Sequence, residues 1–506
     1  MPTKTTADDR LDRELVTLAA VLLVGAVAAL LDTTVVSVAL PRLSDEMGAP
    51  VATVQWVSTG YLLAMAVAIP AMGWLVDRLG ARRTWLAALW CFLVGSLLCG
   101  AAWSVESLIA FRVLKGLGAG LVLPLVQAIL AGAAGPARVG RVMAVVGIPG
   151  QLAPVVGPVV GGAVLSSLGW RWLFLVNVPV VAVALVAAHR HLPDTGRRVP
   201  TRLDLPGLAL AAPGLAALLA GLAAAGRSAD PADAPVVAAT ATGAALLAGF
   251  VLHARRRRER ALLDVRLLRV GRFGAATASL FLFGVSLYGP LLVLPLFYER
   301  VHGATPDAVG WLLAPQGLGT MVGLWVAGRA TDRVGARPVA LAGTALVALA
   351  TLPFRAAGPE TPLAWLAAAS AVRGAGLGAA GVAVLGGAYR DVPEPAVPRA
   401  TSLLHVVQRI GASFGTAAMA VVLQRGLAAA GGDAPAEVAG AFRTAFGWSV
   451  GLALAALVPA LALPRRPPPP ASEVGRDLPG EQVLALDPAG LDPEQRREPV
   501  EVRHDL

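Results

Sequence analysis

The residue with the clearest capacity for chemistry is Asp32, an acid inside the apolar run LLDTTVVSVALP at residues 30–41. The whole run begins near Leu15 and ends at Pro41, and Asp32 is its only charged residue. Moving a carboxylate into a bilayer costs about 2.5–3.5 kcal/mol even on lenient insertion scales. Ionisable groups inside membrane segments are therefore first interpreted as functional. The position of Asp32 predicts a group that binds and releases a proton.

The composition indicates the environment of the chain. Its 506 residues are 56% hydrophobic and only 15% charged, with a mean hydropathy of +0.68. A soluble protein of this length needs more polar surface, so we expect an integral membrane protein. The formal net charge is +10. Because the basic residues cluster in alternate loops between apolar runs, this charge does not indicate nucleic-acid binding.

Fourteen apolar segments are long enough to cross a bilayer as helices. They are 15–39, 54–75, 85–102, 107–130, 142–167, 172–188, 204–226, 235–253, 273–298, 309–330, 339–356, 362–388, 401–425 and 441–463. If the N-terminus is cytoplasmic, the pair Arg82 and Arg83 and the basic run 255–258 both lie inside. This asymmetry predicts that both termini are cytoplasmic.

A duplicated signature divides the chain into two halves. GWLVDRLGARR at 73–83 and GRATDRVGARP at 328–338 share six residues, each displaced by 255 positions. KGLGAG at 115–120 and RGAGLG at 373–378 form a shorter echo. These repeats predict two parallel six-helix halves, with the two segments at 204–253 inserted between them.

The first copy of the signature has the residue types of a gate between the halves. Gly73 lets a neighbouring helix approach closely, and Asp77 can face the positive N-terminus of that helix. The arginines supply charge partners that must separate if the halves rock apart. The candidate gate residues are Gly73, Asp77, Arg78, Gly80 and Arg82. The alternative is a short charged loop that only marks the inner face of the membrane.

This loop resembles the motif of the major facilitator superfamily, G-x-L-x-D-R-x-G-R/A-R. Further stretches resemble the motifs of its fourteen-span drug:proton antiporter family, and the resemblance covers about residues 15–463. They are LDTTVVSVALP (31–41), FRVLKGLGAG (111–120), GIPGQLAPVVGPVVGG (147–162), WRWLFLVNVP (170–179) and QRIGASFG (408–415). In the second of these, Arg112 takes the arginine position and Lys115 replaces the more usual glutamine.

The resemblance implies an all-α integral membrane fold of two parallel six-helix halves plus two additional central spans. The expected parts are a cytoplasmic N-terminal tail (1–14), an N-terminal half (15–188), two inserted helices (204–253), a basic cytoplasmic loop (254–272), a C-terminal half (273–463) and a disordered cytoplasmic tail (464–506). The inserted helices carry no ionisable group between Asp204 and Arg227 or between Asp233 and His253. We therefore expect them to lie outside the transport path.

The resemblance also implies that the first and fourth spans adjoin, which places Arg112 beside Asp32. Desolvation favours the neutral carboxyl group and a nearby cation favours the carboxylate, so the pair is a candidate for proton coupling. A static ion pair that only orients the helices is the alternative. In the second half, Arg373 and Arg409 are expected to hold helices or backbone carbonyls.

The fifth span is rich in glycine and proline. Its candidate gate residues are Pro154, Gly157, Pro158, Gly161 and Gly162. Each proline removes a helix donor and can bend the helix, and the glycines permit close packing on a neighbour. The resemblance implies that this span is the antiporter-specific gate, and ordinary tight packing is compatible with that role.

Polar and aromatic residues within the spans are the candidates for a substrate cavity. They are Tyr61, Gln127, Gln151, Asn177, Tyr288 and Gln316. A large apolar cavity with few polar groups suits amphipathic organic compounds of varied shape.

These observations predict a proton-driven exporter of amphipathic drugs, antibiotics or natural products in the cell membrane. We expect a monomer in the lipid bilayer whose partners are protons and a small organic substrate, with no enzymatic activity, nucleic acid, metal or cofactor. The sequence contains no G-x-x-x-x-G-K-[ST] motif, so ATP is not the expected energy source. A carrier of the same fold for a metabolite or lipid is the alternative.

Overall fold

The computed structural model describes residues 13–135, 138–193, 202–226, 233–257, 261–270, 272–430 and 435–465. By its contacts the chain divides into Met1–Pro468 and Pro469–Leu506. The second unit lies outside the described residues, as does most of the predicted tails at 1–14 and 464–506. Within the described residues, thirteen helices are long and apolar enough to cross a membrane. The 30-residue helix α8 (Val139–Leu168) supplies a fourteenth, so the all-α prediction is confirmed.

The six segments of the first half each correspond to helical structure. The spanning helices are α1 (Arg13–Val35), α4 and α5 (Trp56–Ala68 and Met72–Leu79), α6 (Ala81–Gly100), α7 (Val105–Ala134), α8 and α10 (Asn177–His191). Between α4 and α5 the chain forms a short 3-10 segment, η2 (Ile69–Ala71), around Pro70, which has no N–H for an α-helical bond. Short elements cap the bundle: η1 (Val36–Ala39), α2 (Leu40–Met47), α3 (Val51–Val54) and α9 (Trp172–Leu175).

The second half repeats this plan after an inserted helix pair. The pair is α11 (Leu205–Ala225) and α12 (Ala234–Arg257), and the half consists of α13 (Phe273–His302), α14 (Pro306–Val334), α15 (Ala336–Ala356), α16 (Leu363–Ala388), α17 (Val397–Ala430) and α18 (Pro435–Ala460). Two 3-10 segments, η4 (Val265–Arg269) and η5 (Glu394–Ala396), precede α13 and α17. The predicted segments were correct in number, but most of the helices extend several residues beyond them.

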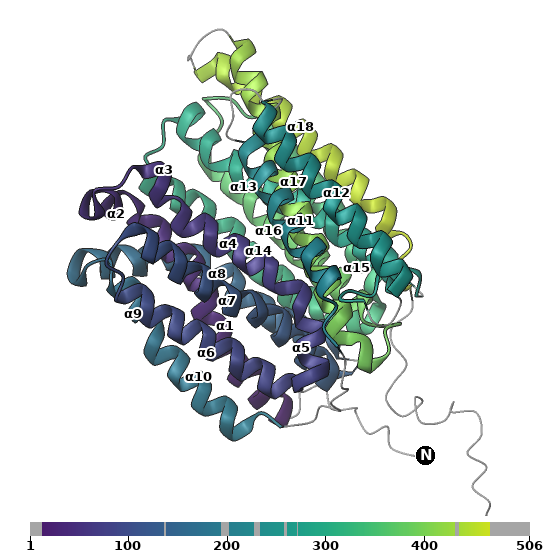
Figure 1. Ribbon diagram of the computed structural model, residues 1–506. Helices are drawn as coiled ribbons and strands as arrows, with labels where there is room; N and C mark the ends of the chain where they lie inside the picture. The colour runs from purple at the N-terminus through teal and green to yellow at the C-terminus, as the bar shows by residue number, and fades with distance from the viewer. Residues whose placement is uncertain are drawn as a thin grey trace, which may run out of the picture. The chain divides into compact units, whose positions relative to one another are not determined.

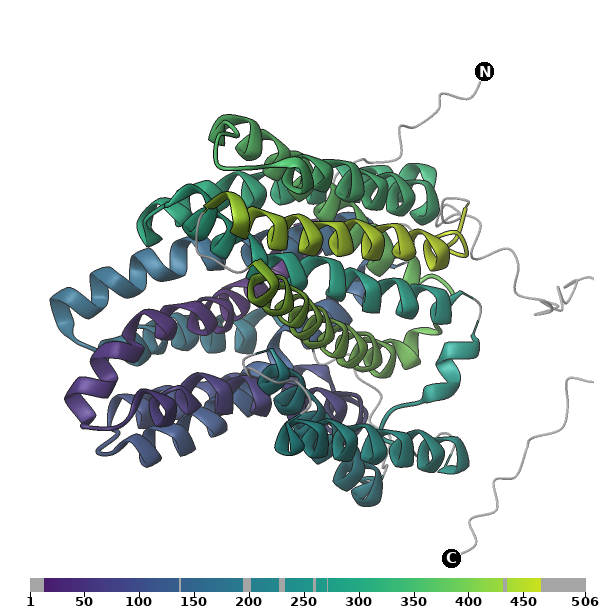
Figure 2. The ribbon, with the colours of Figure 1, turned by 90° about the horizontal axis from the view of Figure 1, so that it is seen from above.

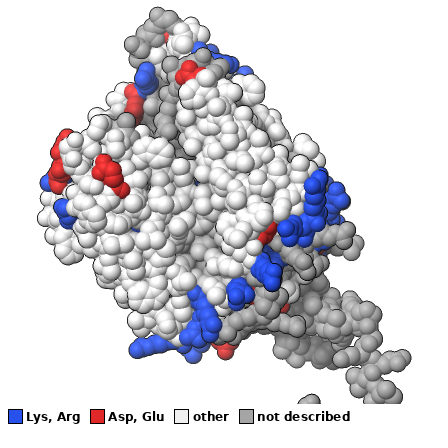
Figure 3. All heavy atoms as spheres, in the orientation of Figure 1, with Lys and Arg blue, Asp and Glu red and all other residues white. Residues whose placement is uncertain are grey.

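The outer surface of the helices is apolar. Figure 3 shows a broad face without charge, and the basic side chains gather toward its lower end. Five exposed tryptophans lie just before or within the first two turns of helices at the end of the bundle opposite the duplicated loops: Trp56, Trp103, Trp172, Trp311 and Trp365. Tryptophan is enriched where a membrane meets water. The surface is that of a multi-pass membrane protein.

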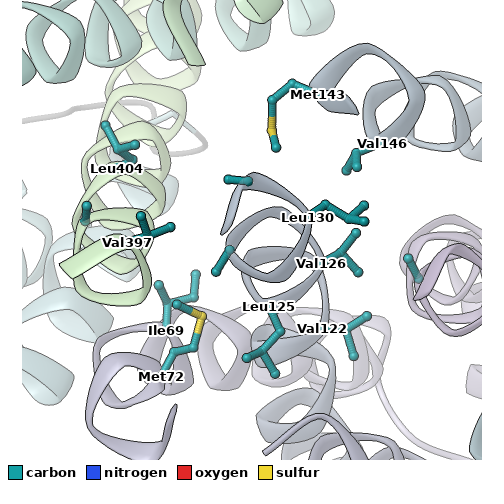
Figure 4. Close-up of a cluster of buried hydrophobic side chains, with 14 of the residues drawn as sticks. Ile69, Met72, Val122, Leu125, Val126, Leu130, Met143, Val146, Val397 and Leu404 are labelled. Carbon is teal, nitrogen blue, oxygen red and sulfur yellow. The ribbon is translucent and has the colours of Figure 1, made fainter. Parts of the chain in front are cut away.

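The two halves meet along a few helices. Figures 1 and 2 show the first half, in purple and blue, beside the second half, in teal to yellow. α8 packs on α14, and α17 packs on both α5 and α7. Figure 4 shows the apolar contact between them, where Val397 and Leu404 of α17 lie near Ile69, Met72 and α7. This contact closes the bundle at the end that carries the duplicated loops.

Candidate functional site

Asp32 lies at the centre of a buried cluster of charges. Its Oδ2 accepts a hydrogen bond from Arg112 Nη1 at 2.5 Å, and its Oδ1 accepts one from Lys115 Nζ at 2.6 Å. Asn177 Nδ2, at the start of α10, donates a third at 3.2 Å. The two cations lie three residues apart on α7, which places them on one helix face toward α1. The side chains of Asp32 and both cations are at most 1% exposed.

The surroundings of the cluster satisfy the remaining polar groups. Arg112 Nε donates to the carbonyl of Val57 at 3.0 Å, and its guanidinium lies 3.8 Å above the ring of Tyr61. Lys115 Nζ lies 4.6 Å above the ring of Phe92. Buried charges are tolerated when they are paired and hydrogen-bonded. With two cations and one carboxylate, the cluster has a formal charge of +1.

Three members of this cluster differ from the sequence prediction. Tyr61 and Asn177 were predicted to line the substrate cavity, but both are buried against the charges. Lys115 was not predicted as a site residue. A signal for it existed, because Lys4 and Lys115 are the only lysines in a chain that otherwise uses arginine. A lysine within a span, three residues after Arg112, could have been paired with Asp32.

The first duplicated loop connects the two halves. Asp77, at the end of α5, accepts hydrogen bonds from Arg399 of α17 at 2.7 Å (Nη2) and 2.9 Å (Nε). Gly73 makes room for this contact, since a Cβ there would lie 2.8 Å from Arg399 Cγ. Arg78 is exposed. Arg82 bonds the carbonyl of His189 at 2.7 Å, which is a contact within the first half rather than across the interface.

The second copy of the signature makes the corresponding contact between the two halves. Asp332, at the end of α14, accepts hydrogen bonds from the backbone N–H groups of Gly140 and Arg141 at 3.0 and 3.3 Å and from Arg141 Nε at 3.2 Å. These N–H groups belong to the first turn of α8, where backbone donors have no helical partner. Gly328 lies against this turn, as its Cβ would meet Gly140 O at 3.0 Å. Both acids therefore bind the start of a helix in the opposite half.

The second glycine of each signature is required by the backbone conformation. Gly80 and Gly335 have φ values of 84° and 95°, and each directly precedes a new helix. Residues with a side chain rarely adopt this conformation. The two positions are 255 residues apart, so the repeat preserves a turn as well as an acid.

A cavity of about 670 Å³ lies between the halves. Its walls include Leu30 and Thr33 of α1, Met65 of α4 and Gly120 of α7. On the other side lie Tyr288 and Leu291 of α13 together with α17 residues His405, Arg409, Ser413 and Thr416. Of the predicted lining residues, Tyr288 is at the wall. The side chain of Gln151 lies outside the described part of the chain.

The remaining predicted lining residues hold helices together. Gln127 Oε1 accepts a hydrogen bond from His405 Nε2 at 2.9 Å, which joins α7 to α17 across the interface. Gln316 Oε1 accepts a hydrogen bond from Arg373 Nη1 at 2.7 Å, and Arg373 Nη2 also donates to the carbonyl of Ser286 at 3.1 Å. Gln127 and Gln316 are buried and do not border the cavity.

Two further predictions need correction. Arg409 was expected to hold helices, but it borders the cavity and makes no hydrogen bond or ion pair among the described residues. The inserted pair was expected outside the transport path. α12 is peripheral, but Leu222 and Ala223 of α11 line the cavity because α11 packs on both α4 and α17.

The fifth span, α8, is a continuous helix that packs tightly on α1. A Cβ at Gly157 would lie 1.9 Å from Thr34 Oγ1, and one at Gly161 would lie 3.0 Å from Val35 O. Thr34 Oγ1 also donates to the carbonyl of Ala153 at 3.1 Å. Gly162 faces open space, so close packing does not explain it. The side chains of Pro154 and Pro158 lie outside the described part of the chain.

Comparisons with known proteins agree with this architecture. The model of the Major Facilitator Superfamily matches residues 22–302 and 275–497. The chain is 39% identical over 417 residues to a multidrug resistance protein B homolog of Mycobacterium tuberculosis, covering 82% of this chain and 77% of that protein. It is 31% identical over 327 residues to a putative multidrug resistance protein MdtD of Serratia proteamaculans, covering 64% and 67%.

Solved structures share the fold at low sequence identity. The human organic anion transporter MFSD10 matches with a TM-score of 0.60 and 18% identity, covering 89% of this chain and 100% of that one. The proton:xylose symporter XylE matches with a TM-score of 0.57 and 14% identity, covering 86% and 94%. The duplicated loops, the two six-helix halves and these matches together show that the chain belongs to the major facilitator superfamily, within its multidrug efflux family.

Proposed function

We propose that the protein exports amphipathic small molecules across the cell membrane in exchange for protons, by alternating access to the central cavity. The observation that carries the proposal is the buried Asp32 carboxylate of α1, held by Arg112 and Lys115 of α7, and both of these helices also line the cavity. A buried carboxylate with two cationic partners has two stable arrangements, ionised and paired or protonated and released. The names of the similar multidrug resistance proteins support the substrate class.

In the proposed cycle the duplicated loops lie on the cytoplasmic side. Because the bundle is closed at that end, the described conformation is the one that opens outward. Protonation of Asp32 removes the charge that Arg112 and Lys115 bind, which frees α1 to move relative to α7. For the cavity to open toward the cytoplasm, Asp77 must then separate from Arg399, and Asp332 must separate from the start of α8. Moving one charge through the membrane potential supplies about 2.3 kcal/mol per 100 mV, enough to drive a useful concentration gradient.

The test is proton flux in everted membrane vesicles that hold the full-length protein. Compounds of varied shape are scored for their ability to collapse a preset pH gradient. Asp32→Asn keeps the shape of the side chain and removes its titration, so it should abolish substrate-dependent proton flux. Asp204→Asn is the matched control, because Asp204 is also a buried acid but does not border the cavity, and instead caps α11 and binds His253 and the Leu262 N–H. Undiminished flux in Asp32→Asn would contradict the proposal.

A further inference from the structure

The central cavity carries polar groups mainly on one wall. His405, Arg409, Ser413 and Thr416 all border it from α17. Spacings of three and four residues keep these side chains on one helix face. Among the described residues that line the cavity, none is aspartate or glutamate. The wall therefore offers a cation and hydrogen-bonding groups to an occupant, without a carboxylate.

Arg409 differs from the other arginines inside the bundle. Arg112 is paired with Asp32, and Arg373 donates hydrogen bonds to Gln316 and to a backbone carbonyl. Arg409 is partly buried at the cavity, and within the described part of the chain it has no hydrogen bond or ion pair. Its neighbour His405 is already bonded to Gln127. A guanidinium at a partly desolvated wall gains most from an anion that it can bind with two parallel hydrogen bonds.

The acid on the opposite side of the cavity does not neutralise Arg409. The Asp32 carboxylate is already bound by Arg112 and Lys115, and all three side chains are buried. Their formal sum is +1, so this cluster adds positive potential to the walls instead of cancelling it. A cleft with low-dielectric walls concentrates ligands of the opposite charge.

We propose that the cavity selects amphipathic organic anions, with the carboxylate or sulfonate of the substrate on Arg409 and its apolar body against Leu30, Met65 and Leu291. This inference rests on the proposed export function and assigns its substrate class. Cationic compounds of the same size and hydrophobicity are disfavoured, because they would meet Arg409 and the positive cluster with no described acid at the wall.

The test uses three probes with one fluorophore and different charges. Dansylglycine is anionic, dansylamide is neutral and dansylcadaverine is cationic. Binding is measured by fluorescence with the full-length protein in phosphatidylcholine vesicles, without a pH gradient. Dansylglycine should bind about tenfold or more tightly than dansylcadaverine, as expected for one unscreened charge at short range. Arg409→Gln should remove this difference, and Arg409→Lys should retain much of it.

Arg425→Gln is the matched control, since Arg425 lies on the same helix but is exposed and outside the cavity. It should leave the preference unchanged. A preference for the cationic probe, or an anion preference that survives Arg409→Gln, would overturn the inference. Displacement of dansylglycine by added phosphatidylglycerol would assign the cavity to a lipid headgroup and would also overturn it. If the anionic and cationic probes bind equally tightly while substrate-dependent proton flux is intact, this inference alone is refuted. The export proposal is tested separately, by the proton flux.

Discussion

The ion pair between Asp77 and Arg399 is expected to hold the two halves together at the duplicated-loop end. The side chains are only 16% and 19% exposed, and the carboxylate accepts two charge-assisted hydrogen bonds. A hydrogen bond to a charged group contributes about 1.5–3 kcal/mol. Asp77→Asn keeps the shape and removes the charge. It should shift the equilibrium between the closed and open forms of this end toward the open form by about ten- to hundredfold.

The assay is a distance distribution between two spin labels on opposite sides of this contact. Arg78, in the last turn of α5, and Glu394, in η5, are exposed and belong to different halves, so each can carry a label. Cys91 and Cys99 are the native free cysteines and must first be replaced. The short-distance population should dominate with Asp77 present and should fall in Asp77→Asn.

A charge swap separates the ion pair from other effects of the substitution. Arg399→Asp alone should open this end, because two carboxylates then face each other. Asp77→Arg combined with Arg399→Asp should recover at least part of the closed population, since the pair is restored in reverse. If the distance distribution is the same in all of these variants, Asp77 does not hold the halves together and the duplicated signature only marks one face of the membrane.

Two further predictions concern the interior of the first half. Lys115→Met should move the pH optimum of proton-coupled transport upward, because Asp32 loses one of the cations that favour its ionised form. An unchanged pH profile in vesicle transport would show that Lys115 is not part of the coupling site. Gly157→Val should abolish transport or insertion, since its side chain would overlap Thr34, whereas Gly162→Ala meets open space and should be tolerated. Equal transport rates in these two variants would argue against close packing of α8 on α1.

The sequence was sufficient for features that depend on local chemistry. Hydropathy located all fourteen spans, because burying the backbone in lipid requires long apolar helices. The repeat at 73–83 and 328–338 predicted two halves, and the glycines of that repeat occupy turns and contacts where a side chain would not fit. Helix ends were less accurate, since the chain continues as helix where spans project beyond their apolar core.

Only the tertiary structure decided which side chains face the cavity. The spans are apolar on all faces, so the sequence contains no amphipathic pattern that fixes the rotation of a helix about its axis. For that reason Tyr61 and Tyr288 looked equivalent, although packing buries Tyr61 under Arg112 and leaves Tyr288 at the cavity wall. The same packing brings Lys115 to Asp32, which lies 83 residues earlier in the chain, and leaves Arg409 facing the cavity. The sequence by itself determined that a buried acid was present, and the folded arrangement of helices determined its partners.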